Sequence, residues 1–198
     1  VVSPRVSKRL PVFVEQKDLR QLLEELRFPD GWEGTLHRMM LLLLYSTGIR
    51  LSELVQLKLS QVDLSLQSIR VLGKGNKERV VPMTTALAEA LTSYLTLRNK
   101  VEGAAESTAL LVREGGKPVY PRYVQLVVQR YLSLVTTVEK RSPHVLRHSF
   151  ATHLVNNGAE LNAVKELLGH SSLAATQVYT HNTIEKLKEV HRRAHPKS

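Results

Sequence analysis

The sequence contains no cysteine, and it has no long apolar run. Without cysteine, disulfide bonds and thiolate metal sites are excluded, and a reducing cytosol is the simplest compartment to expect. No apolar run approaches the roughly 20 residues that a membrane-spanning helix requires, and the longest, residues 39–45, is better explained as a buried helix. We therefore expect a cytoplasmic protein that makes no membrane contact.

Nucleotide-binding motifs are missing as well. Neither G-x-G-x-x-G nor G-x-x-x-x-G-K-[S/T] occurs in the chain. The expected order of helices and strands also lacks the β-α-β alternation of parallel sheets, which argues against Rossmann and P-loop folds. A reaction driven by ATP or a dinucleotide is therefore not expected.

Acidic residues are few relative to basic ones. The 198 residues include 28 Lys and Arg but only 18 Asp and Glu, for a net charge of +10. Such a charge favours polyanionic partners, with nucleic acid first and an acidic membrane surface second. An otherwise ordinary basic protein can have the same composition, so charge alone leaves the partner open.

Hydrophobic residues make up 42% of the chain, enough for the core of one substantial domain. Apolar residues at helical spacing predict mostly helices, and β-branched residues on both sides of Gly73–Lys77 predict a β-hairpin over residues 68–82. The expected fold class is mainly α with a small antiparallel β-sheet (α+β). Helices are expected at about 15–27, 32–46, 50–58, 84–100, 121–135, 143–156, 160–168, 173–179 and 183–194, and a short strand at 110–113.

Polar side chains suited to phosphoryl transfer stand at breaks in the apolar segments. Two guanidiniums can clamp the oxygens of a phosphodiester in its transition state. An imidazole can donate or take a proton, and a lysine can protonate the departing oxygen. A tyrosine can be the nucleophile when nearby cations or a base make it reactive. This chemistry needs no metal and no cofactor, and its candidate residues are Arg50, Lys74, His144, Arg147, His170 and Tyr179.

Four ordered motifs resemble those of the tyrosine recombinases. Residues 46–54 (STGIRLSEL) are similar to the box of the first arginine, and residues 143–154 (PHVLRHSFATHL) to the H-x-x-R box. Residues 167–170 (LLGH) and 176–181 (TQVYTH) are similar to the closing histidine and nucleophile boxes. The Xer branch is the nearest match, also in its tail, and the resemblance implies the catalytic-domain fold shared with type IB topoisomerases.

The resemblance implies a role for each residue that would touch the scissile phosphate. Tyr179 would form a 3′-phosphotyrosyl link, and Arg50 and Arg147 would clamp the phosphate. His170 would donate a hydrogen bond to it. Glu53 would orient Arg50 without touching the phosphate itself.

Further roles fall on the hairpin and on the H-x-x-R box. Lys74 would be the general acid that protonates the 5′-oxygen, and His144 would be the partner that acts as a base. Lys77 and Arg79 extend from the hairpin turn, so we expect both to contact the DNA backbone. Each step exchanges one phosphoester for another, which fits the absence of nucleotide motifs.

The family also implies an organisation and partners. Residues 1–11 are expected to be a linker from an N-terminal core-binding domain absent from this chain, and residues 12–198 the catalytic domain. Its amphipathic C-terminal helix, about 183–194, is expected to dock on a neighbouring subunit, with docking in cis as the alternative. The expected partners are double-stranded DNA with inverted-repeat core sites and a tetrameric synapse of this recombinase or a paralogue, close to the nucleoid.

Each residue also has a simpler explanation. Tyr179 alone is more often a packing residue, Arg50 could cap a helix, and the charged hairpin tip could be only a solvated turn. His144 and His148 have a spacing that can bind zinc, but the chain shows neither the H-E-x-x-H glutamate nor a third ligand. At the level of function, a non-catalytic DNA-binding module and a type IB topoisomerase remain alternatives. The order of the motifs favours the recombinase.

Overall fold

The computed structural model describes residues 13–169, 188, 189, 191 and 192. The expected linker at 1–11, the helix expected at 173–179 and most of the helix expected at 183–194 lie outside these residues. In the described part, the chain is mainly helical with one small antiparallel sheet, as the sequence predicted. No helix among the described residues is long and apolar enough to cross a membrane.

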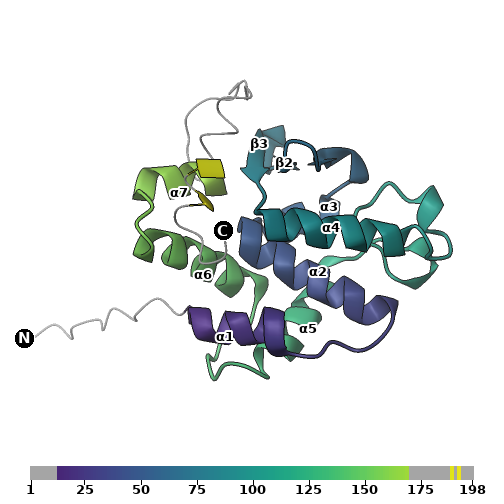
Figure 1. Cartoon of the computed structure of the whole chain (residues 1–198), viewed down its shortest axis with the longest axis horizontal. Coiled ribbons are helices and arrows are strands. Elements are labelled where there is room, and N and C mark those ends of the chain that lie inside the picture. Colours follow the sequence, from purple (N-terminus) through teal and green to yellow (C-terminus); the bar gives the residue numbers. More distant parts are fainter. Residues whose placement is uncertain (1–12, 170–187, 190, 193–198) are drawn as a thin grey trace, which may run out of the picture.

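Helix α2 (Trp32–Thr47) is the centre of the core. Its residues Leu36, Met40 and Leu44 are at most 1% exposed. Helices α4 (Thr85–Arg98) and α6 (Pro143–Asn156) pack against it, as Figure 1 shows. A helix with apolar side chains on most of its surface is expected to be buried on most sides, and α2 confirms that prediction.

The remaining helices follow the predicted order with small shifts at their ends. Helix α1 (Gln16–Arg20) continues as a short π-helical turn at Gln21–Glu25, so the helix expected at 15–27 changes its hydrogen-bond pattern halfway. Helix α3 (Leu51–Gln56) follows α2, and α5 (Pro121–Leu132) precedes α6. Helix α7 (Leu161–Leu168) is the last complete helix in the described residues.

The sheet has three strands, one more than expected. The hairpin is formed by β2 (Ser68–Leu72) and β3 (Glu78–Pro82), with Ile69 opposite Val81 and Leu72 opposite Glu78. The two-residue strand β1 (Val62–Asp63) pairs with the other edge of β2. The strand expected at 110–113 is not formed in the described residues: Val112 makes only an isolated bridge to Pro118.

Candidate active site

Arg50 is positioned by the sharp turn between α2 and α3. Gly48 ends α2 with φ +65°, and a Cβ atom at that position would lie 2.4 Å from a ring carbon of Phe150. Both the left-handed conformation and the close packing therefore require glycine. The turn places Arg50 in extended conformation at the N-terminus of α3, with 39% of its side chain exposed.

Glu53 holds Arg50 from inside the protein. Its Oε2 atom accepts a hydrogen bond from the Arg50 backbone N–H at 2.8 Å, and its Oε1 atom accepts one from Arg50 Nη1 at 3.1 Å. The first bond satisfies a backbone donor at the start of α3. Glu53 thus contacts both the backbone and the side chain of Arg50, and its role in orienting Arg50 toward a phosphate stays a prediction.

Arg79 also binds Glu53, and more closely than Arg50 does. Its Nη1 and Nη2 atoms donate to the two carboxylate oxygens at 2.6 and 2.9 Å, and both side chains are nearly buried. Burial raises the pKa of Glu53, but the hydrogen bonds and charges of Arg79 and Arg50 outweigh it, so the net pKa lies below its ordinary value. Glu53 is therefore a buried carboxylate that carries its charge.

This position of Arg79 differs from the expected contact with the DNA backbone. The residue is 6% exposed, and its Nε atom donates to the carbonyl oxygen of Leu167 at 3.0 Å. Lys77, two residues earlier, is exposed. Strand alternation places residues two apart on the same face, so it does not distinguish Lys77 from Arg79. The partners that hold Arg79 inside, Glu53 and the Leu167 carbonyl, are distant in the sequence. Lys77 is accessible and its contact with DNA stays a prediction, whereas the Arg79 side chain is buried against Glu53.

Lys74 stands at the exposed tip of the same hairpin. The turn is closed by a hydrogen bond from the Gly73 backbone N–H to the Lys77 carbonyl at 2.8 Å. Gly75 and Asn76 both have positive φ, of +71° and +57°. The Lys74 amine is therefore accessible at the tip of the hairpin.

Arg147 enters the site from α6 and is almost entirely buried, at 6% exposure. It donates from Nη1 to the Gly48 carbonyl and from Nη2 to the Leu168 carbonyl, the latter at 2.7 Å. Burial first, and then the positive charges of Arg50 and Arg79, lower the pKa of the Arg147 guanidinium to about 10, against an opposite effect of Glu53. The positive charges therefore lie close enough to repel one another, and an anion bound beside them would relieve that repulsion.

His144 lies one helical turn before Arg147 and is exposed. It borders an open pocket of about 450 Å³ together with Arg50. Gln125 of α5 and Ser142, just before α6, line the same pocket. Sequence reasoning missed both, although Ser142 stands directly before the H-x-x-R box and so had a signal.

The described residues bring together Arg50, Glu53, Arg147 and the rim residue His144. Arg79 joins them from β3. The expected site residues His170 and Tyr179 lie outside the described residues. In the described part of the chain, no three His, Cys, Asp or Glu side chains gather where they could hold a metal ion.

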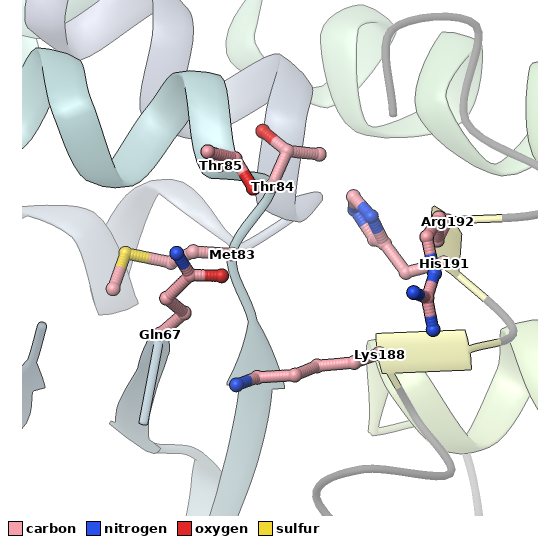
Figure 2. Close-up of a pocket in the computed structure, with 7 residues that line it drawn as sticks. All are labelled: Gln67, Met83, Thr84, Thr85, Lys188, His191 and Arg192. Atoms are coloured by element: carbon pink, nitrogen blue, oxygen red, sulfur yellow. The ribbon is translucent and has the colours of Figure 1, made fainter. Parts of the chain in front are cut away.

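Four residues of the expected C-terminal helix are described, and they contact the same chain. The imidazole of His191 is 2% exposed, and its Nε2–H donates to the Ser46 carbonyl at 2.9 Å. Figure 2 shows Lys188, His191 and Arg192 across a pocket of about 210 Å³ from Gln67, Met83 and Thr84. This arrangement agrees with docking in cis, and docking on a neighbour stays a prediction.

The chain belongs to the phage integrase family, whose sequence model matches residues 12–186. A relative from Chlorobaculum parvum, tyrosine recombinase XerC, is 41% identical over 216 residues, which cover 99% of this chain and 64% of that protein. The first three curated relatives are matched over 64% to 66% of their own length, so this chain spans slightly less than two thirds of them. The resemblance to the Xer branch is confirmed.

Solved structures show the same fold. The XerA recombinase superposes with a TM-score of 0.71 at 27% identity, covering all of this chain and 68% of that chain. The XerH recombinase, in a post-cleavage complex with a palindromic difH substrate, superposes with a TM-score of 0.72 at 28% identity, covering 91% of this chain and 52% of that chain. The fold is that of tyrosine recombinase catalytic domains.

Proposed function

We propose that this chain is the catalytic part of a site-specific DNA recombinase that cleaves and rejoins strands through a 3′-phosphotyrosyl intermediate at Tyr179. The observation that carries the proposal is the convergence of Arg50 and Arg147 from different helices, close enough to lower the pKa of Arg147. Two cations held close to each other suit a phosphodiester whose negative charge grows in the transition state. The net charge of +10 suits DNA.

In the proposed reaction, the Tyr179 oxygen attacks the scissile phosphorus and the bond to the 5′-oxygen breaks. Lys74 gives its proton to that oxygen, which leaves as a 5′-hydroxyl. Arg50 and Arg147 hold the non-bridging oxygens, His170 donates a further hydrogen bond, and His144 helps to take the tyrosine proton. Religation is the reverse attack by a 5′-hydroxyl. One phosphoester replaces another, so no external energy source is required.

The exposed hairpin and the family membership support wider proposals. The substrate is double-stranded DNA with inverted-repeat core sites, and the active assembly is a synaptic tetramer of this recombinase or a paralogue, in the cytoplasm at the nucleoid. Deleting residues 183–198 should weaken synapsis more than single-site binding, and equal effects on both would contradict a role of the C-terminal helix between subunits.

A nicked suicide substrate tests the chemistry. Loss of the short strand after cleavage traps the covalent adduct, which is scored on a denaturing gel. Tyr179→Phe should abolish the adduct because it removes the attacking oxygen, while Tyr120→Phe, a change at a partly exposed tyrosine on the surface, should leave it. Adducts that persist in Tyr179→Phe would contradict the nucleophile assignment.

The same preparation separates the alternative functions. A DNA-binding module would shift DNA without forming any adduct, in the wild type as well. A type IB topoisomerase would form adducts and relax any supercoiled plasmid without preference for sequence. The proposed recombinase forms adducts only on its own sites.

A further inference from the structure

Arg79 connects three segments that each lead to a residue of the proposed site. Its own strand, β3, closes the hairpin that carries Lys74. Its Nη atoms bind Glu53, which holds Arg50 on α3. Its Nε atom binds the carbonyl of Leu167, in the last turn of α7 and three residues before His170 in the sequence.

The surroundings are fitted to this guanidinium. A Cβ atom at Gly169 would lie 3.2 to 3.4 Å from the Arg79 side chain, tighter than ordinary contact, and Gly169 has φ +74°. A Cβ atom at Gly73, beside Lys74, would lie 3.5 Å from Glu53 Oε1. The two glycines, Gly73 and Gly169, thus let the backbone pack closely against the Glu53–Arg79 ion pair.

The geometry also requires arginine rather than a cation in general. The guanidinium is planar, and its N–H groups point in fixed directions. Here the two Nη atoms donate to the Glu53 carboxylate, and the Nε atom donates to the Leu167 carbonyl. A lysine amine is a compact charge that cannot bridge both partners with the same geometry. Charge alone would therefore restore only part of the arrangement.

We propose that Arg79 is a positioning residue for strand cleavage, which sets the place of Arg50 through Glu53 and the place of the end of α7 through Leu167. This inference rests on the proposed function. Arg79 touches no reacting atom, and it acts by fixing two elements whose side chains do. A displacement of about 1 Å in such groups can cost about 100-fold in rate.

Electrostatics provides a signature that a merely structural role lacks. Glu53 is buried, and burial is the largest influence on its pKa, in the raising direction. Arg79 is the main opposing influence, ahead of Arg50. Without Arg79, the Glu53 pKa should rise, and a protonated Glu53 holds Arg50 less firmly. Cleavage by such a variant should therefore weaken as the pH falls.

The test uses single-turnover cleavage of the suicide substrate by the full-length chain at saturating DNA, from about pH 8 to about pH 5.5. Arg79→Gln should slow cleavage by about 100-fold with little change in DNA affinity. The ratio of its rate to that of the wild type should decrease as the pH falls. Adding Glu53→Gln should abolish that extra pH dependence, and Arg79→Lys should recover the rate only in part.

Arg98→Gln is the matched control, because Arg98 is equally buried but lies on α4 with carbonyl partners. It should lower the melting temperature and leave the cleavage rate of the folded protein unchanged. If Arg79→Gln does not fold, the rate of Arg79→Lys relative to wild type decides. If the wild type forms adducts and the folded Arg79 variant cleaves at the wild-type rate, the positioning role alone is overturned. If the wild type forms no adduct, the proposed function itself is overturned.

Discussion

Arg79 and Arg98 are both buried in the described part of the chain, and their partners differ. Arg79 binds the carboxylate of Glu53 through both Nη atoms. Arg98, 1% exposed at the end of α4, donates instead to the backbone carbonyls of Ser107, Ala109 and Leu110. Burial lowers the pKa of Arg98, against a small opposite effect of Tyr94.

The charge of Arg98 stabilises the fold, whereas the charge of Arg79 also acts on the proposed site. Arg98 fixes an irregular loop by filling its carbonyl acceptors, and any group with the same donors would serve. Arg79 belongs to a chain of charges in which a buried anion holds two cations, and one of these, Arg50, faces the pocket. Buried ion pairs add little stability over apolar packing, so their presence here suggests a functional requirement.

The largest expected effect concerns Arg147. Arg147→Lys keeps the charge but loses the planar pair of Nη donors that reach both the Gly48 and the Leu168 carbonyls, so the cation is held less firmly in place. Single-turnover cleavage should fall about 10³-fold, as for loss of a fixed oxyanion donor. Arg130→Lys on the exposed face of α5 is the control. A loss below tenfold would remove Arg147 from the phosphate clamp.

Replacing Arg79 should cost more stability than replacing Arg98. Arg79→Met leaves Glu53 without its main partner and should cost about 3–5 kcal/mol in unfolding free energy. Arg98→Met leaves carbonyls unsatisfied and should cost about 1–3 kcal/mol. Urea unfolding measures both.

A double replacement sharpens the contrast. Glu53→Met combined with Arg79→Met should recover most of the lost stability, because apolar packing replaces the ion pair, yet it should not recover cleavage. Recovery of both would mean that the charges serve only the fold.

A smaller effect should appear with pH. Burial lowers the pKa of His153 below 6.5, and its Nδ1 atom hydrogen-bonds the Tyr45 hydroxyl. The unfolded chain therefore binds the proton more readily, so stability present above about pH 6.5 is lost as the pH falls toward the folded-state pKa. His153→Gln does not titrate, and its unfolding free energy should fall less between about pH 6.5 and pH 5. Parallel curves for the two proteins would contradict this.

The smallest expected effect distinguishes two neighbours on the hairpin. Lys77 is exposed and Arg79 is buried. Lys77→Ala should lower the salt dependence of DNA binding by about one unit of log–log slope, whereas Arg79→Gln should leave the slope unchanged. A reduced slope in Arg79→Gln would show that the guanidinium reaches DNA after all.

The sequence predicted the helices that have long apolar stripes, because periodicity alone determines which face they bury. It did not predict β1, whose two residues pair only because the hairpin is already beside them. It also assigned a strand to residues 110–113, where the Leu110 carbonyl accepts hydrogen bonds from the side chains of Tyr94 and Arg98.

The site residues show the same division. Arg50 and Arg147 could be named from motifs, and the described geometry brings their charges together. The burial of Arg79 could not be predicted from local pattern, because its partners Glu53 and Leu167 lie 26 and 88 residues away in the chain. Long-range pairing of charged groups is a property of the fold and leaves no local periodicity.

The central claim is that Arg50 and Arg147 form one binding site for a phosphate-like anion. Crystals of the protein soaked with tungstate, located by its anomalous scattering, test this most directly. We predict a single strong site within hydrogen-bonding distance of both guanidiniums, which is lost in Arg147→Lys. Tungstate bound to only one of the two, or bound elsewhere while this pocket stays empty, would contradict the account.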